Sequence, residues 1–236
     1  MRAAALVLAA GEGVRLGAPV PKALVCLAGK TLLERSLAVF VEIDAVGCVV
    51  PVLPAADAAG WKASEPHPKL VNAVPGGARR QDSVAAGLAS LPADVELVLV
   101  HDAARCLVSR ADVEAVLRAA RESGAAILAR PSPDTIKLVQ GGVVASTPER
   151  RACWAAQTPQ VFRVELLREG LEKAAAEGFT ATDDAQLVER LGVPVTIVEG
   201  SASNLKITHP IDLAVAEVLL ARQLPDPEER GPGGRA

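Results

Sequence analysis

The stretch that most constrains this chain runs from residue 3 to residue 22. It begins with a short apolar run, Ala3–Leu8, whose length and composition are typical of a buried strand. A loop of small residues follows, and its backbone amides can approach a phosphate chain because few side chains stand in the way. Two cations, Arg15 and Lys22, come directly after this loop. We therefore predict a polyphosphate site here, with these loop residues as candidates: Ala9, Ala10, Gly11 and Gly13.

The spacing of the glycines excludes two common nucleotide-binding motifs for this loop. It partly matches G-x-G-x-x-G, but Leu16 occupies the third glycine position, so the dinucleotide-binding pattern is not met. The Gly-Lys-Ser/Thr of a Walker A motif is also missing from this stretch. An ordinary strand-to-helix turn is the alternative. The two cations favour an anionic ligand, because they are costly to gather unless something neutralises them.

Apolar runs rich in Val and Leu alternate with helical patterns along the rest of the chain. This alternation predicts an α/β fold, a Rossmann-like, mostly parallel sheet covered by helices. The predicted strands are Ala3–Leu8, Val46–Leu53, Lys69–Val74, Val95–Val100, Ala125–Ala129, Cys153–Ala156 and Val193–Val198. The predicted helices are Thr31–Val41 with a Thr31/Glu34 capping box, Arg79–Leu91, Arg110–Ser123 closed by Gly124, Val164–Glu177, Thr182–Gly192 and Pro210–Arg222.

Residues 130–151 break this alternation. Two short β-like runs, Ile136–Gln140 and Val143–Ser146, are joined by Gly141-Gly142, which is typical of a two-residue hairpin turn. The hairpin has too few apolar residues to fold alone, so we expect a projecting arm that packs on a second subunit. We expect residues 1–222 to form a single domain that includes this arm. The Pro-, Gly- and charge-rich tail, residues 223–236, is expected to be disordered.

Charge and composition exclude several classes of protein. The net charge of −3 over 236 residues argues against a broad nucleic-acid-binding face. The apolar runs fall short of the roughly 20 residues that span a bilayer, and the N-terminus lacks the layout of a signal peptide. The four cysteines lie far apart, which indicates neither a disulfide framework nor a zinc site. We expect a cytoplasmic protein that binds neither nucleic acid nor membrane.

Four clusters of residues fall where predicted strands end, the edge at which open parallel sheets bind ligands. They are Ala9–Arg15, Gly76–Ser83, His101–Arg105 and Asn204–Thr208. The last three also have simpler explanations: a plain turn with a solvent-facing Ser83, a local Asp102–Arg105 ion pair, and a solvated Lys206. Together the clusters supply a phosphate cradle, cations and a carboxylate, which favours phosphoryl or nucleotidyl transfer with Mg²⁺.

Two other polar features of the sequence are given structural explanations. Thr182-Asp183-Asp184 is typical of a helix N-terminus, where a cap and acidic residues are favoured by the helix dipole. His101 and His209 lack a partner pattern, and we expect neither to be a catalytic base.

The motifs, taken together, resemble a known family. Leu8–Leu16 followed by Pro21-Lys22 closely resembles the signature of sugar-phosphate nucleotidyltransferases, which specifies the superfamily but not the substrate. The stretches that narrow it are Gly76-Gly77, Asp82-Ser83, His101–Arg105, Trp154–Gln160 and Asn204–Thr208. Residues 3 to 221 are thus similar to the 2-C-methyl-D-erythritol 4-phosphate cytidylyltransferase family of the non-mevalonate isoprenoid pathway.

The resemblance implies a reaction of CTP with 2-C-methyl-D-erythritol 4-phosphate that releases pyrophosphate. Arg15 and Lys22 would be catalytic, stabilising charge on the α-phosphate, and the glycine loop would hold the triphosphate. The other implied nucleotide-binding residues are Gly76, Gly77, Ser83, Asp102 and Ala103. Mg²⁺ would be bound mainly through the CTP phosphates, and no protein ligand for it is named.

The acceptor side of the implied site combines residues of two subunits. The implied substrate-binding residues are Asp102, Arg105, Thr135, Arg150, Thr158, Thr182 and Lys206. Of these, Thr135, Arg150 and Thr158 match family positions that reach the neighbouring subunit's site, so the resemblance implies a homodimer through the arm.

Two positions leave questions open. Arg150 is chosen because it lies four residues before Trp154, and Arg151 is the alternative. Ala78 stands where the family often carries an acid after the glycine pair, which leaves open how cytosine is selected.

A cytidylyltransferase for another polyol phosphate, such as ribitol phosphate, is the alternative within enzymes. A non-catalytic nucleotide-binding subunit is the alternative from another class, and the combination of Arg15, Lys22, Asp102 and Lys206 argues against it.

Overall fold

A computed structural model describes residues 2–11, 16–17 and 20–222 of the chain. Two predicted site residues, Gly13 and Arg15, lie outside the described residues, as does the tail over residues 223–236.

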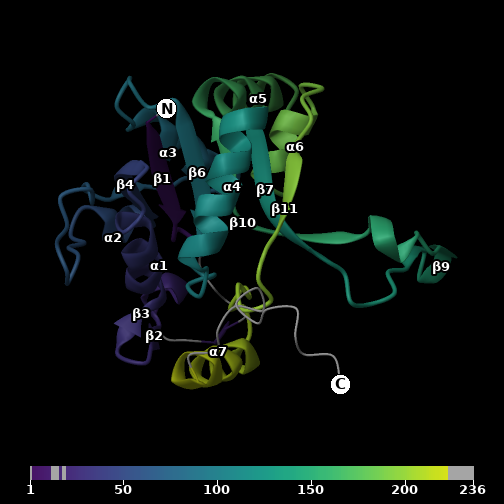
Figure 1. The fold of residues 1–236 in the computed structure, drawn as a ribbon, viewed down its shortest axis with the longest axis horizontal. Coiled ribbons are helices and arrows are strands. Elements are labelled where there is room, and N and C mark those ends of the chain that lie inside the picture. The colour runs from purple at the N-terminus through teal and green to yellow at the C-terminus, as the bar shows by residue number, and fades with distance from the viewer. Residues whose placement is uncertain (1, 12–15, 18–19, 223–236) are drawn as a thin grey trace, which may run out of the picture.

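The described part of the chain forms a seven-stranded sheet in the order β11-β7-β10-β6-β1-β4-β5 (Figure 1). Its strands are β1 (Ala3–Leu8), β4 (Val46–Leu53), β5 (Val74–Pro75), β6 (Leu97–Asp102), β7 (Ala125–Pro131), β10 (Trp154–Arg163) and β11 (Thr196–Glu199). All neighbouring pairs are parallel except those of β10, which runs antiparallel to both β6 and β7. The predicted mostly parallel sheet is confirmed.

Helices cover both faces of this sheet, so its central strands are apolar throughout. Along β1, Ala3, Ala5 and Val7 face one core with α1 (Leu32–Val41) and α4 (Arg110–Ser123). Ala4 and Leu6 face a second core. The helices of this second core are α3 (Arg80–Ala89), α5 (Val164–Ala176) and α6 (Asp184–Glu189). Because successive side chains of the strand point to opposite faces of the sheet, β1 contributes to two separate hydrophobic layers.

Local signals place the ends of these helices. The Thr31 hydroxyl accepts a hydrogen bond from the Glu34 backbone amide at 3.1 Å, and the Glu34 carboxylate accepts one from the Thr31 amide at 2.8 Å. This is the predicted capping box. Helix α4 is followed by Gly124 at φ +85°, a left-handed conformation that glycine adopts without strain.

The structure differs from the predicted elements in several places. The strand predicted over Lys69–Val74 is reduced to β5 at Val74–Pro75 and one isolated bridge between Leu70 and Val49, because this segment is half-exposed at the sheet edge. The strand predicted to end at Ala156 continues to Arg163 as β10. Elements without a sequence prediction are α2 (Ala55–Ala58), η2 (Lys22–Leu24), and the small hairpin of β2 (Cys26–Leu27) and β3 (Lys30–Thr31).

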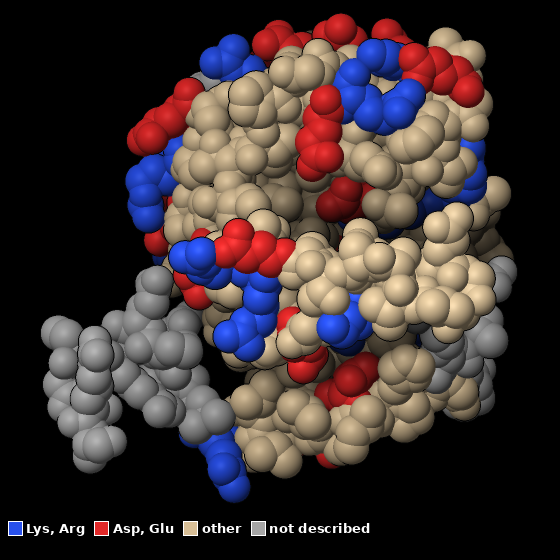
Figure 2. Space-filling view, turned by 90° about the vertical axis from the view of Figure 1, so that its right-hand side faces the viewer, with Lys and Arg blue, Asp and Glu red and all other residues tan. Residues whose placement is uncertain are grey.

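The arm predicted from residues 130–151 projects away from the sheet (Figure 1). It contains the hairpin of β8 (Leu138–Gln140) and β9 (Val143–Ser146), turned by Gly141 and Gly142 at φ +59° and +81°. The short helix η3 (Arg150–Ala152) follows. Large apolar side chains are exposed along it, Val143 by 70%. Figure 2, viewed from this side, shows uncharged surface between groups of both charges. Such exposure fits a surface that packs on another chain.

Helix α7 (Pro210–Arg222) lies beyond the carboxyl edge of the sheet (Figure 1). Its Leu213 and Leu220 pack on a third small cluster that includes Leu27 and Ile207. The segment before it is docked on the loop after β6, because the Ile207 amide donates to the Ala104 carbonyl at 2.9 Å. This places Asn204–Thr208 beside the ends of β1 and β6. Among the described helices, none is long and apolar enough to cross a membrane.

Candidate active site

A cavity of about 390 Å³ opens at the carboxyl ends of β1 and β6. Leu8 at the end of β1 is in register with Val52 of β4 and with Asp102 of β6, so the three strands end together. The cavity is lined by Leu8, Ala9, Ala10, Gly11, Lys22, Ala23, Gly77, Ala78, Arg79, Arg80, Ser83, Asp102, Ala103, Ala104, Lys206 and Thr208. It therefore contains residues from all four clusters that the sequence placed at strand ends.

The turn before α3 forms one wall, and close packing fixes it. The Gly76 amide donates to the Leu53 carbonyl at 2.7 Å, and the Gly77 amide donates to Ser83 Oγ at 3.1 Å. A Cβ at Gly76 would lie 2.6 Å from the Ala10 Cβ. Only glycine permits this approach of the turn to the first loop. Ser83 is buried and holds the turn, so the alternative of a solvent-facing Ser83 is wrong.

We expect Gly76→Ala to destabilise the fold by about 1–3 kcal/mol, the usual cost of forcing extra atoms into a packed site. The new methyl group would overlap Ala10 and Ser83. Urea unfolding measures the effect. Gly60→Ala is the matched control, because nothing lies within 4 Å of its added Cβ. Equal stability of the two variants would show that the turn relaxes without cost.

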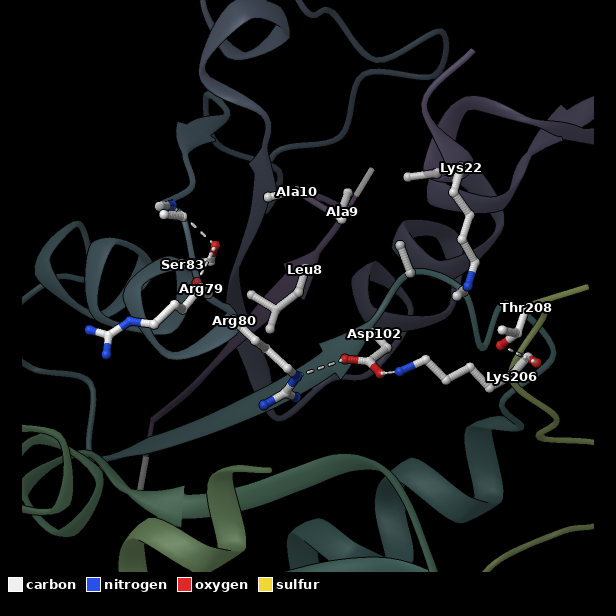
Figure 3. Close-up of a pocket in the computed structure, with 16 residues that line it drawn as sticks. Leu8, Ala9, Ala10, Lys22, Arg79, Arg80, Ser83, Asp102, Lys206 and Thr208 are labelled. Carbon is white, nitrogen blue, oxygen red and sulfur yellow. Dashed lines mark hydrogen bonds and ion pairs between the residues drawn. The ribbon is translucent and has the colours of Figure 1, made fainter. Parts of the chain in front are cut away.

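Asp102 stands at the floor of the cavity between two cations from distant parts of the chain (Figure 3). Its Oδ1 lies 3.2 Å from Arg80 Nε, and its Oδ2 accepts a hydrogen bond from Lys206 Nζ at 2.7 Å. Burial disfavours the carboxylate, but Arg80 and Lys206 outweigh it and hold the pKa of Asp102 well below its usual range. The alternative of a local ion pair with Arg105 is therefore wrong.

Arg80 also contacts a second carboxylate, that of Asp184 at the start of α6. Arg80 Nη1 lies 2.7 Å from Asp184 Oδ2, and the Asp184 side chain is only 1% exposed. Burial raises the pKa of Asp184 despite this cation. For Arg80, burial opposes the charge, but Asp184 and Asp102 raise its pKa above the ordinary arginine value. The guanidinium is a permanent cation at the junction of α3, β6 and α6.

Lys22 reaches the same space from η2 and points toward the end of β6 (Figure 3). Its charge also acts on Asp212 in the first turn of α7, whose carboxylate accepts the Thr208 and His209 amides at 2.8 and 2.7 Å. Burial opposes the Asp212 charge, while these hydrogen bonds and the charges of His209 and Lys22 lower its pKa. Lys22 and Lys206 thus bring two lysine cations to one cavity.

Arg105, Thr158 and His101 lie beneath this floor and hold it together. Arg105 donates to the Asn204 carbonyl at 2.8 Å and to the Ala156 carbonyl at 3.1 Å. Thr158 Oγ1 accepts from the Asp102 amide at 3.0 Å and lies 3.2 Å from His101 Nδ1. Burial lowers the pKa of His101 to about 3, so the ring is neutral at physiological pH. It does not line the cavity, which agrees with the expectation that it is no catalytic base.

The sequence prediction and the cavity overlap closely. Of the described candidates, those that line the cavity are Ala9, Ala10, Gly11, Lys22, Gly77, Ser83, Asp102, Ala103 and Lys206. Gly76 packs directly behind Ala10. Thr182 is exposed beside the N-terminus of α6, where Asp183 caps the helix by accepting from the Gln186 amide.

The residue that sequence reasoning missed is Arg80. It lay within the Gly76–Ser83 cluster at the opening of a predicted helix and was assigned no role of its own, yet it contacts the carboxylates of Asp102 and Asp184. The one available signal was its position three residues after the Gly76-Gly77 turn, which puts it on the first turn of α3 facing the end of β6.

Two candidates, Thr135 and Arg150, are exposed on the arm away from this cavity. The Arg151 guanidinium is paired with Glu149, with Nε 2.9 Å from Oε1. Within the described residues the Arg150 side chain makes no such pair, which leaves its charge available to another chain.

The fit of Mg²⁺ to this cavity depends on its carboxylates. Among the described lining residues Asp102 is the one carboxylate, and both of its oxygens contact cations. No group of three or more His, Cys, Asp or Glu side chains suited to a metal occurs among the described residues. The cavity fits a metal ion carried on the phosphates of a nucleotide, the form of binding that Mg²⁺ commonly takes.

Comparisons with known proteins identify the family. Residues 3–222 match the family model of 2-C-methyl-D-erythritol 4-phosphate cytidylyltransferase. This chain belongs to that family. The cytidylyltransferase of Chromobacterium violaceum is 48% identical over 222 residues, which cover 92% of this chain and 97% of the relative. That of Desulforamulus reducens is 42% identical over 224 residues, covering 93% and 96%.

Solved cytidylyltransferase structures share the fold. The crystal structure of the Thermus thermophilus 2-C-methyl-D-erythritol 4-phosphate cytidylyltransferase superposes with a TM-score of 0.78 at 43% identity, covering 94% of this chain and all of that one. The 4-diphosphocytidyl-2C-methyl-D-erythritol synthase of Anaerococcus prevotii gives a TM-score of 0.81 at 30% identity, covering 94% and 96%. The family resemblance and the fold predicted from the sequence are therefore confirmed.

Proposed function

We propose that this chain transfers the cytidylyl group of CTP to 2-C-methyl-D-erythritol 4-phosphate. The products are 4-diphosphocytidyl-2-C-methyl-D-erythritol and pyrophosphate. A phosphate oxygen of the acceptor forms the new bond to the α-phosphorus of CTP, and the bond from that phosphorus to the pyrophosphate oxygen breaks. The single observation that carries this proposal is the cavity in which a bare loop, two lysines and Asp102 converge in a chain of this family.

The residues around the cavity suit this reaction without a proton acceptor. A phosphate dianion is already a nucleophile at neutral pH, and His101 is buried and neutral. Lys22 stabilises the charge that develops on the α-phosphate, together with Arg15 from the loop. Such preorganised charge is usually the largest single contribution to catalysis of this kind.

The two substrates approach from different sides of Asp102. The triphosphate lies along Ala9–Gly11, and the base and ribose lie against the Gly76-Gly77 turn, Ser83 and Ala103. Asp102 accepts a hydrogen bond from a ribose or acceptor hydroxyl, and Lys206 binds the acceptor phosphate. Thr158 is buried and accepts a hydrogen bond from the Asp102 amide of its own subunit, so its role differs from the one across the subunit boundary that the resemblance implied. Thr158 and Arg105 act on the acceptor through the backbone they hold. Mg²⁺ held on the phosphates of CTP would neutralise part of their charge, as in other phosphoryl transfers.

The arm completes the site in a homodimer. Its exposed apolar side chains, Leu138, Val139, Val143 and Val144, pack on a second copy of the chain. This brings Thr135 and Arg150 of one subunit to the acceptor side of the other, near Thr182. The uncompensated charge of Arg150 supports this role.

A pyrophosphate-release screen of the four nucleoside triphosphates against several polyol phosphates tests the proposed function. We expect the fastest release with CTP and 2-C-methyl-D-erythritol 4-phosphate. Faster release with ribitol phosphate would replace the acceptor but keep the chemistry. Ala78 lines the cavity where the family often carries an acid. Comparing the rates of pyrophosphate release with CTP and with UTP therefore tests most directly how the base is selected. No release with any pair would overturn the proposal.

A further inference from the structure

The Arg80 side chain joins two buried carboxylates that belong to different parts of the chain. Its Nε lies 3.2 Å from Asp102 Oδ1 and its Nη1 lies 2.7 Å from Asp184 Oδ2. The Asp102 side chain is 13% exposed and that of Asp184 1% exposed. A buried carboxylate without a cation strongly destabilises the folded state. Arg80 therefore supplies the cation for both carboxylates at once.

The two cations on Asp102 differ in how firmly they are held. Arg80 is fixed by Asp184 and by its place on the first turn of α3, and its planar fork sets the direction of each contact. Lys206 extends from the loop before α7, and its side chain is 43% exposed. A lysine ammonium is a point charge on a flexible stem. Arg80 is thus the permanent partner of Asp102, and Lys206 is the exchangeable one (Figure 3).

This difference matters for an anionic acceptor. In the structure Lys206 is bound to Asp102, so an acceptor phosphate must draw Lys206 away from that carboxylate. If Arg80 were absent, Lys206 would be the sole cation in direct contact with Asp102 and would be held more tightly. Asp102 would also be free to rotate toward Lys206, because its Oδ1 would have lost its partner.

We propose that Arg80 is a positioning residue that fixes and neutralises Asp102, so that Lys206 can exchange from Asp102 to the acceptor phosphate. This inference rests on the proposed function, because it assigns the acceptor phosphate to Lys206. Arg80 acts through Asp102 and Lys206 and need not touch the acceptor itself. Its loss should therefore raise the KM for the acceptor more than the KM for CTP.

The experiment must separate this role from a structural one, in which Arg80 only balances Asp184. We suggest comparing Arg80→Gln with the double variant Arg80→Gln/Asp184→Asn, and using Asp184→Asn alone as its reference. In the double variant the second carboxylate no longer needs a cation. Arg110→Gln is the matched control, because Arg110 makes exposed ion pairs with Glu114 and Asp44.

The expected result has two parts. Arg80→Gln lowers the Tm and raises the acceptor KM about tenfold, equivalent to about 1.4 kcal/mol of lost binding. The double variant recovers the Tm of Asp184→Asn but keeps the raised acceptor KM. Recovery of the acceptor KM along with the Tm would show a structural role only and would overturn the proposal. An unchanged acceptor KM in Arg80→Gln would also overturn it.

A measurement without acceptor keeps this test separate from the proposed function. The Asp102 carboxyl carbon can be followed by ¹³C NMR, with its signal assigned by comparison with Asp102→Asn. We expect a higher Asp102 pKa in the double variant than in Asp184→Asn. Equal pKa values in the two variants would show that the Arg80 charge does not stabilise the Asp102 carboxylate. Failure of the unmodified protein in the pyrophosphate screen would reject the proposed function and leave this result standing.

Discussion

Replacement of Lys22 by alanine should lower kcat by between about a hundredfold and a thousandfold, the range seen when one preorganised transition-state donor is removed. Lys22 enters the cavity from η2, on the side away from Arg80, with its charge directed at the space above Asp102 (Figure 3). Stability should change little, because the side chain is only half-buried and lies outside the main cores. Single-turnover pyrophosphate release measures the chemical step, and thermal unfolding measures stability.

Lys62→Ala provides the matched control for this variant, because Lys62 is exposed and does not line the cavity. It should retain the kcat of the unmodified protein. Two outcomes would count against the assignment. A Lys22→Ala protein with unchanged kcat would remove Lys22 from the mechanism. A loss of kcat that merely follows a loss of folded protein would assign Lys22 a structural role.

Replacement of Arg150 by alanine should abolish most of the activity, although this residue lies on the exposed arm. The reason is that its guanidinium would act in the site of the other subunit. The acceptor KM should rise more than the CTP KM, because Arg150 is assigned to the acceptor phosphate. Arg151→Ala tests the alternative: Arg151 is already paired with Glu149, so its loss should have a smaller effect.

Heterodimers of Lys22→Ala and Arg150→Ala test whether the site is shared. In a shared arrangement one site of the heterodimer carries both defects and the other carries none, so about half of the normal activity should return. If Arg150 acted within its own subunit, each site would carry one defect and activity would stay low. Purification through two different affinity tags isolates the heterodimer. Its inactivity would therefore exclude the shared site.

The local signals in the sequence were sufficient for much of the fold. The strand at Ala3–Leu8, the capping box of Thr31 and Glu34, and the helix end at Gly124 were all placed correctly. Each depends on residues within a few positions of one another, so the chain carries the information locally. The prediction of a strand over Lys69–Val74 was wrong. Whether an edge segment is a strand depends on how many of its residues pair with the neighbouring strand, and here only Leu70, Val74 and Pro75 pair with β4.

The sequence by itself also determined the chemical class of the site, because the Ala9–Gly11 loop, Lys22, Asp102 and Lys206 each follow a strand or precede a helix in a recognisable pattern. Only the tertiary structure decided how their charges are matched. Asp102 took its partners from Arg80, 22 residues before it, and Lys206, 104 residues after it. Ion pairs over such separations have no sequence periodicity. They form because the carboxyl ends of β1, β4 and β6 meet at one edge, and burial there makes an unpaired carboxylate too costly.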